Sequence, residues 1–178
     1  MADTPAQPCE VLQSNAHLLP AAGKALDLAA GSGGNALFLA RHGLETEAWD
    51  ISSVAMERLA TAAATAGLTI GTGIRDIINN PPQAQQFDVI VVCRFLHRPL
   101  CPQITDALRP GGLLFYQTFL SNRINPQIGP RNPAYLLQRN ELLRLFSSLK
   151  VVAYREEGVL AGRTGIFGNE ACLVAQKA

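Results

Sequence analysis

Short apolar stretches alternate along this chain with longer segments in which apolar residues recur at helical spacing. Continuous β-branched stretches are typical of strands covered on both faces, and a period of 3.6 residues is typical of helices. The expected strands are residues 24–30, 45–50, 68–76, 87–93, 113–119, 150–157 and 171–176. The expected helices are residues 36–43, 52–67, 100–112 and 140–149. This order of elements predicts an α/β protein.

The alternation predicts a Rossmann-like, doubly wound sheet of seven strands, mostly parallel. The last strand is expected to be antiparallel, because only the short glycine-rich link 158–169 joins it to the strand before. Residues 120–139 show no clear periodicity, and loops of this length inside compact domains usually border a binding site. A chain of 178 residues is expected to form a single domain, residues 1–178.

Composition narrows the class of protein. Apolar residues make up 48% of the chain, charged residues 16%, and the net charge is +1, which gives no electrostatic case for binding nucleic acid. No apolar stretch is long enough to cross a bilayer, and Asp3 and Glu10 stand where a secretory signal would carry positive charge. The four cysteines form no CxxC pair. We therefore expect a cytoplasmic protein that binds neither membrane nor nucleic acid.

Cys93, His97 and Cys101 are spaced four apart and would share one face of a helix as zinc ligands. Pro99 and the strand character of 87–93 break such a helix. We therefore expect no metal site.

A glycine-rich turn, residues 31–35, follows the first expected strand. Its glycines let a ligand approach the backbone, and the amides at the start of the next helix point toward that ligand. Asp50 follows the second strand, nineteen residues beyond Gly31, and a carboxylate there suits a ribose diol. The spacing of Gly31, Gly33 and Ala36 also satisfies the dinucleotide pattern G-x-G-x-x-A, so these residues alone leave an NAD(P) site open.

Further polar residues follow the third and fourth strands. Asp76 could accept a hydrogen bond from an adenine amine while Ile51 and Ile77 sandwich the ring. Asp50 and Asp76 could equally be structural caps of the turns after them. Cys93, Arg94 and His97 follow the fourth strand and are expected to face the middle of the same cleft, with Arg94 also a candidate for a structural ion pair.

The ordered series "LDLAAGSGGN", "WD", "RD", "FDVIVVCRFLH" and "LRPGGLLFYQTF" resembles the motifs of class I S-adenosylmethionine-dependent methyltransferases over residues 24–119. The "GGN" continuation and the end of the fourth strand resemble the small bacterial tellurite-resistance-type methyltransferases most closely. The resemblance divides the chain into an N-terminal cap segment, 1–23, a cofactor-binding core, 24–119, and an acceptor side, 120–178. The chain departs from the family pattern at Ala29, where glycine is common.

The resemblance implies S-adenosylmethionine as the cofactor. The cofactor-binding residues it implies are Asp27, Ala29, Gly31, Ser32, Gly33, Asn35, Asp50, Ile51, Asp76, Ile77, Cys93 and Arg94. Asp76, the acid at the end of the third expected strand, and the "RPGG" turn favour this cofactor over a dinucleotide.

The expected activity is direct in-line methyl transfer to a small-molecule acceptor by a monomer or homodimer. His97 is the nearest candidate general base, if the acceptor needs one. Asn122, Arg131 and Arg163 are candidate acceptor residues, and the arginines in these segments suggest an anionic acceptor. A catalytically silent domain that binds S-adenosylmethionine is the alternative, and an NAD(P)-binding protein is a more distant one.

Overall fold

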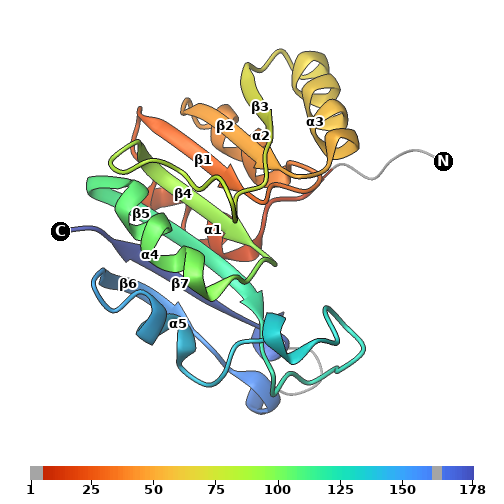
Figure 1. The fold of residues 1–178 in the computed structure, drawn as a ribbon, viewed down its shortest axis with the longest axis vertical. Coiled ribbons are helices and arrows are strands. Elements are labelled where there is room, and N and C mark those ends of the chain that lie inside the picture. Colours follow the sequence, from red (N-terminus) through yellow and green to blue (C-terminus); the bar gives the residue numbers. More distant parts are fainter. Residues whose placement is uncertain (1–5, 162–165) are drawn as a thin grey trace.

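The computed structural model describes residues 6–161 and 166–178 of the chain (Figure 1). Its strands are β1 Lys24–Leu28, β2 Glu45–Asp50, β3 Ile70–Ile74, β4 Phe87–Cys93, β5 Leu108–Phe119, β6 Lys150–Arg155 and β7 Glu170–Gln176. Its α-helices are α1 Glu10–Ser14, α2 Gly34–Arg41, α3 Ser53–Thr65, α4 Cys101–Ala107 and α5 Glu141–Leu145. Short 3-10 helices are η1 Ala16–Leu18, η2 Arg98–Leu100, η3 Pro133–Tyr135, η4 Gly158–Ala161 and η5 Ile166–Gly168.

The strands form one 7-stranded sheet in the order β3-β2-β1-β4-β5-β7-β6. β7 pairs antiparallel with both β5 and β6, whereas β3, β2, β1, β4 and β5 pair in parallel. The predicted doubly wound, mostly parallel sheet with an antiparallel last strand is confirmed. Because the first five strands are parallel, their carboxyl ends lie along one edge of the sheet, and the reversed β7 brings its first residue, Glu170, to that edge opposite Phe119.

Helices cover both faces of the sheet (Figure 1). Along β4, Ile90 and Val92 pack with α4 and α5 in one apolar cluster, and Val89 and Val91 pack with α1 in another. All four side chains are fully buried, as the continuous apolar stretch of β4 predicts. No helix in the described part of the chain is long and apolar enough to cross a membrane.

Two features differ from the sequence-based prediction, the start of β5 and the cap of α5. β5 starts at Leu108, within the expected helix 100–112, because the Gly111 amide donates to the Lys177 carbonyl and extends the pairing at that end. Asparagine is a favoured N-cap residue, so Asn140 is the expected cap of the helix predicted at 140–149. Its side chain makes no cap hydrogen bond to α5; its backbone is left-handed (φ 56°), and its amide donates to Glu156. The loop expected between the third and fourth strands agrees with the structure: the described chain there forms a turn held by Arg75, whose guanidinium donates to the carbonyls of Asn80 and Pro81.

The N-terminal segment, residues 6–14, lies across the carboxyl edge of the sheet. The amide of Cys9 donates to Asn35 Oδ1 at 2.8 Å, and the amide of Val11 donates to Gln117 Oε1 at 2.8 Å. A Cβ on residue 34 would lie 2.3 Å from the Gln7 carbonyl oxygen, so the segment approaches this closely because residue 34 is glycine. The segment therefore forms a wall over the turn after β1.

Candidate active site

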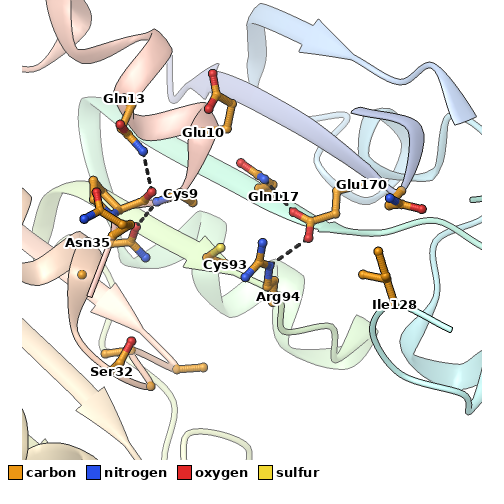
Figure 2. Close-up of a pocket in the computed structure, with 17 residues that line it drawn as sticks. Cys9, Glu10, Gln13, Ser32, Asn35, Cys93, Arg94, Gln117, Ile128 and Glu170 are labelled. Carbon is orange, nitrogen blue, oxygen red and sulfur yellow. Dashed lines mark hydrogen bonds and ion pairs between the residues drawn. The ribbon is translucent and has the colours of Figure 1, made fainter. Parts of the chain in front are cut away.

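A cavity of about 640 Å³ lies at the carboxyl edge of the sheet beneath the N-terminal segment. A volume of this size is typical of a small-molecule site. Its lining residues are Gln7, Pro8, Cys9, Glu10, Gln13, Ala29, Ala30, Gly31, Ser32, Gly34, Asn35, Cys93, Arg94, Gln117, Ile128, Asn169 and Glu170. In Figure 2, Asn35 and Cys9 lie at one end, Arg94, Gln117 and Glu170 lie at the other, and Cys93 lies between them.

The turn after β1 forms one end of the cavity. Gly31 and Gly33 have left-handed backbones, with φ of 51° and 78°, and Gly33 is the N-cap residue of α2. The turn thus presents backbone amides and a helix N-terminus to the cavity without side chains in the way. Ser32 also lines the cavity, whereas Gly33 packs against Leu59 of α3.

Asp27 lies beneath the turn and is fully buried, so it does not line the cavity. Its two carboxylate oxygens accept hydrogen bonds from Asn35 Nδ2 at 3.1 Å and from the Ala36 amide at 3.0 Å. Burial raises the pKa of Asp27 to about 7 against the lowering effect of these two donors. The geometry gives Asp27 the role of orienting Asn35, while Asn35 itself reaches the cavity.

Ala29 stands where glycine is common in the family, and the structure shows what this alanine costs. Its backbone is left-handed, with φ of 57°, a conformation that a residue with a Cβ adopts at a cost of about 1–2 kcal/mol. Arg94, at the end of β4, has the same conformation with φ of 55°. Both residues line the cavity, so the strained backbone coincides with the candidate site.

Asp50 ends β2 beside the same turn. Its Oδ2 accepts from the Gly31 amide at 2.8 Å, and its Oδ1 accepts from the Ser52 amide at 2.9 Å. The Ser52 hydroxyl is the actual cap of α3, since it accepts from the Ala55 amide. Asp50 therefore ties the turn to β2, and each of its oxygens keeps lone pairs for the hydroxyl groups of a ligand.

A second hollow of about 160 Å³ adjoins the cavity at Ala29 and Asp50. Ile51 (70% exposed) and Ile78 (48% exposed) line it, and large apolar side chains this exposed fit the faces of a flat heterocycle. Ile77 also lines the hollow but is largely buried. The sequence reasoning missed Ile78, which comes directly after Ile77. It placed Phe95 beside Arg94 facing the cleft but assigned it no role.

Asp76 lines this hollow and also caps the turn after it. Its Oδ1 accepts from the amides of Ile78 and Asn79, and its Oδ2 accepts from Asn79 Nδ2 at 2.7 Å. The hydrogen bond from the Asn79 side chain and those from the two amides lower the pKa of Asp76. The structural explanation considered for Asp76 therefore holds, and its ionised oxygens keep acceptor capacity toward the hollow.

A polar network forms the other end of the cavity. Glu170 is 5% exposed, and it accepts from Arg94 Nε at 2.8 Å and from Gln117 Nε2 at 2.6 Å. Gln117 Oε1 in turn accepts from the Val11 amide of the N-terminal segment. The two terminal NH2 groups of Arg94 make no hydrogen bond to any described residue, and the side chain is 63% exposed. The sequence reasoning missed Gln117 and Glu170.

A third hollow of about 350 Å³, between the loop after β5 and the end of β4, holds the candidate base. It is lined by Ile78, Arg94, Phe95, Leu96, His97, Pro130 and Tyr135. His97 is not among the residues that line the 640 Å³ cavity. It therefore borders the site through Arg94 and Phe95 and does not face the middle of the cleft.

Of the candidate acceptor residues, the two that the structure describes, Asn122 and Arg131, do not line the cavity. Arg131 is exposed, the side chain of Asn122 lies beside Gly158, and Arg163 lies outside the described residues. Arg123 of the same loop is buried, and its guanidinium donates to the carbonyls of Leu120, Pro126 and Pro130, which holds residues 120–130 in place. From this loop, Ile128 reaches the cavity instead.

Within residues 6–161 and 166–178, no cluster of three or more His, Cys, Asp or Glu side chains could hold a metal ion. Cys101 and His97 are separated by the 3-10 helix η2, where Pro99 lies, and the Cys101 thiol contacts the His97 carbonyl oxygen at 3.8 Å.

The sheet order, the glycine turn after β1 and the acids after β2 and β3 are those of the class I S-adenosylmethionine-dependent methyltransferase fold. The family model described as "Tellurite resistance protein TehB" matches residues 3–174, and the chain belongs to this family. The family decides between the two cofactors that the glycine spacing left open, in favour of S-adenosylmethionine. The exposed isoleucines and the glycine turn fit that group, with its adenine ring and its amino-acid tail.

Solved structures share the fold. TehB from Haemophilus influenzae superimposes with a TM-score of 0.75 at 22% identity over 95% of this chain and 62% of that one. The chain thus spans less than two thirds of the Haemophilus protein. A SAM-dependent methyltransferase from Methanosarcina mazei gives a TM-score of 0.73 at 21% identity over 96% of this chain and 98% of that one. No curated protein matches the chain by sequence.

Proposed function

We propose that the protein transfers the methyl group of S-adenosylmethionine to a small oxyanion by direct in-line displacement. The observation that carries the proposal is the continuity of one cavity of about 640 Å³ from the glycine turn to the Arg94–Glu170 pair. Bound S-adenosylmethionine supplies a methyl group activated by the sulfonium. The protein's own task is to hold the acceptor and that methyl group in line and to exclude water.

The cofactor end is assigned to residues of the turn and the neighbouring strand ends. The backbone of Gly31 and Ser32, with Asn35 and Cys93, would hold the methionine part, and Asp50 would accept from the ribose hydroxyls. The adenine ring would lie between the side chains that line the second hollow, with Asp76 toward its amine. These assignments extend the family's cofactor to particular residues.

The acceptor end is assigned to Arg94, Gln117 and Glu170. Arg94 offers two unused NH2 groups, and a planar guanidinium binds oxyanions through paired, charge-assisted hydrogen bonds. Glu170 and Gln117 hold Arg94 in this orientation. The family description points to tellurite as the first acceptor to try. An ionised oxyanion needs no base, so His97 would act only for a protonated acceptor that reaches the third hollow.

The test is conversion of S-adenosylmethionine to S-adenosylhomocysteine by the purified protein with tellurite, selenite, small thiols and small amines in turn. We expect turnover with an oxyanion, and we expect Arg94→Gln to lower kcat/KM for it at least tenfold. The matched control is Arg131→Gln, an exposed arginine of the loop after β5 that does not line the cavity, which should retain activity within twofold. Turnover only with thiols or amines would overturn the oxyanion assignment. Cofactor binding without any turnover would favour a silent binding domain.

A further inference from the structure

Two cysteines from distant parts of the chain meet in the cavity wall. Cys9 directly precedes α1 in the N-terminal segment, and Cys93 is the last residue of β4. Both line the 640 Å³ cavity, where Figure 2 shows them next to each other. The neighbouring Cys93 side chain and burial both raise the pKa of the Cys9 thiol. The proposed function places Cys93 beside the methionine part of the cofactor but gives neither thiol a step in the methyl transfer.

The two thiols differ in access. Cys9 is buried, whereas Cys93 is half-buried and open to the cavity. A small oxidant that enters the cavity therefore reaches Cys93 first, and Cys9 stands behind it. This is the arrangement of an attacked thiol with a resolving partner.

The other two cysteines do not line the cavity, although Cys172 belongs to the same apolar cluster as Cys9. Cys101 is buried on α4 in the cluster on the opposite face of the sheet. Cys172 on β7 and Cys93 on β4 are both register partners of Gln117, which lies on the strand between them. All four cysteines are free thiols in this structure.

We infer that Cys9 and Cys93 are a thiol-oxidation site that forms a reversible disulfide with a peroxide and thereby closes the cofactor cavity. In the first step the Cys93 sulfur is oxidised to a sulfenic acid, and the peroxide is reduced with release of one water molecule. In the second step the Cys9 sulfur attacks the Cys93 sulfur, the S–S bond forms, and the hydroxyl group leaves with the Cys9 proton as a second water molecule.

The Cys9–Cys93 disulfide would hold the N-terminal segment in place as the wall of the cavity. In the reduced protein the N-terminal segment is held by the buried side chains of Val11 and Leu12, and by hydrogen bonds that include those from Cys9 to Asn35 and from Val11 to Gln117. The movement in this proposal is a local opening of the stretch before Val11, which breaks the hydrogen bond from Cys9 to Asn35 and leaves the buried side chains in place. A covalent link at residue 9 removes that movement. The effect on the cofactor rests on the proposed function, whereas formation of the disulfide does not.

The experiment treats the full chain with hydrogen peroxide, alkylates the remaining thiols and maps the peptides by mass spectrometry. We expect a Cys9–Cys93 cross-link that a phosphine reductant reverses. We also expect S-adenosylmethionine to dissociate at least tenfold more slowly from protein that is oxidised after loading. Each variant is compared with its own reduced form: Cys9→Ser should lose the response to peroxide, and the control Cys101→Ser should keep it.

The outcomes separate the two ideas. Alkylated Cys9 beside over-oxidised Cys93, or a cross-link to Cys172, would overturn the disulfide. A mapped Cys9–Cys93 bond with unchanged cofactor dissociation would overturn closure of the cavity. Reduced protein that binds no S-adenosylmethionine would refute the proposed function and closure together, while the peptide map would still decide the disulfide.

Discussion

Alanine substitutions at three glycines separate backbone strain, core packing and ligand contact. Gly31, Gly33 and Gly67 have φ of 51°, 78° and 65°, so all three have left-handed backbones. A Cβ costs about 1–2 kcal/mol there, and alanine recovers about 0.4–1 kcal/mol by restricting the unfolded chain. Backbone strain alone therefore lowers the free energy of unfolding by roughly 1 kcal/mol at each position.

Packing distinguishes Gly33 from the other two. A Cβ there would lie 2.4 Å from Leu59 Cδ1 and 2.9 Å from Leu59 Cγ, whereas at Gly31 and Gly67 no atom lies within 4 Å. Leu59 is fully buried and cannot swing into solvent. Overpacking adds about 1–3 kcal/mol, so we expect Gly33→Ala to lose about 2–4 kcal/mol of stability.

The ligand distinguishes Gly31 from Gly67. Gly31 lines the cavity, so a methyl group there would enter the space assigned to the methionine part of the cofactor. Gly67 follows α3, away from the cavity lining. A misfit of about 1–3 kcal/mol corresponds to a five- to 150-fold weaker affinity. We therefore expect Gly31→Ala to bind S-adenosylmethionine that much more weakly and Gly67→Ala to bind it as the parent protein does.

Calorimetric titration with S-adenosylmethionine and urea denaturation measure the two effects separately. Equal cofactor affinity in Gly31→Ala and Gly67→Ala would refute contact between the cofactor and the turn. Equal stability of Gly33→Ala and Gly67→Ala would refute the packing argument, because only the former meets Leu59.

Three further predictions test single carboxylates. Asp50→Ala should weaken cofactor affinity by about 1–3 kcal/mol by titration calorimetry, while Asp106→Ala, an exposed carboxylate on α4, leaves it unchanged. Glu170→Gln should lower the free energy of unfolding in urea by about 1–3 kcal/mol. The buried carboxylate accepts from two donors, and the amide that replaces it has only one oxygen to accept them. An unchanged urea midpoint would contradict this prediction. The pKa of Asp27 rises from 3.8 to about 7 on folding, so the folded protein holds its proton more tightly and loses stability as pH increases through that window. Thermal melts at pH 5 and pH 8 should show Asp27→Asn gaining stability relative to the parent as pH increases, and a constant difference would count against it.

The fold was predictable wherever burial on both faces dictates the sequence. β4 has its predicted bounds because every residue between Phe87 and Cys93 except Asp88 is apolar or small enough to pack between helix layers. The start of β5 was not predictable, because Leu108 reads as the end of an amphipathic helix. Its strand conformation depends on pairing with Phe87, a contact distant in sequence.

The residues assigned to the cofactor could be predicted from the sequence, because Gly31 and Asp50 lie where parallel strands end. Asp27 illustrates the limit of that reasoning. It lies next to the glycine turn, as its place in the motif predicts, but side chains along a strand alternate between faces, and this one points beneath the turn to Asn35. Sequence position gave its neighbourhood and not its orientation.

Gln117 and Glu170, which we assign to the acceptor, were not predicted from the sequence, and the reason lies in the sheet topology. The rule that sites follow the carboxyl ends of strands holds for parallel strands, but β7 is reversed, so the residue at the functional edge is its first one, Glu170. Gln117 lies inside β5 and reaches the edge only because β5 pairs with Cys93 at that level. Through Gln117, the carboxylate of Glu170 connects Arg94 to the N-terminal segment at Val11. The residues assigned to the acceptor and the wall that covers the cofactor therefore share one hydrogen-bonded unit, and a change at Glu170 should affect both ends of the cavity.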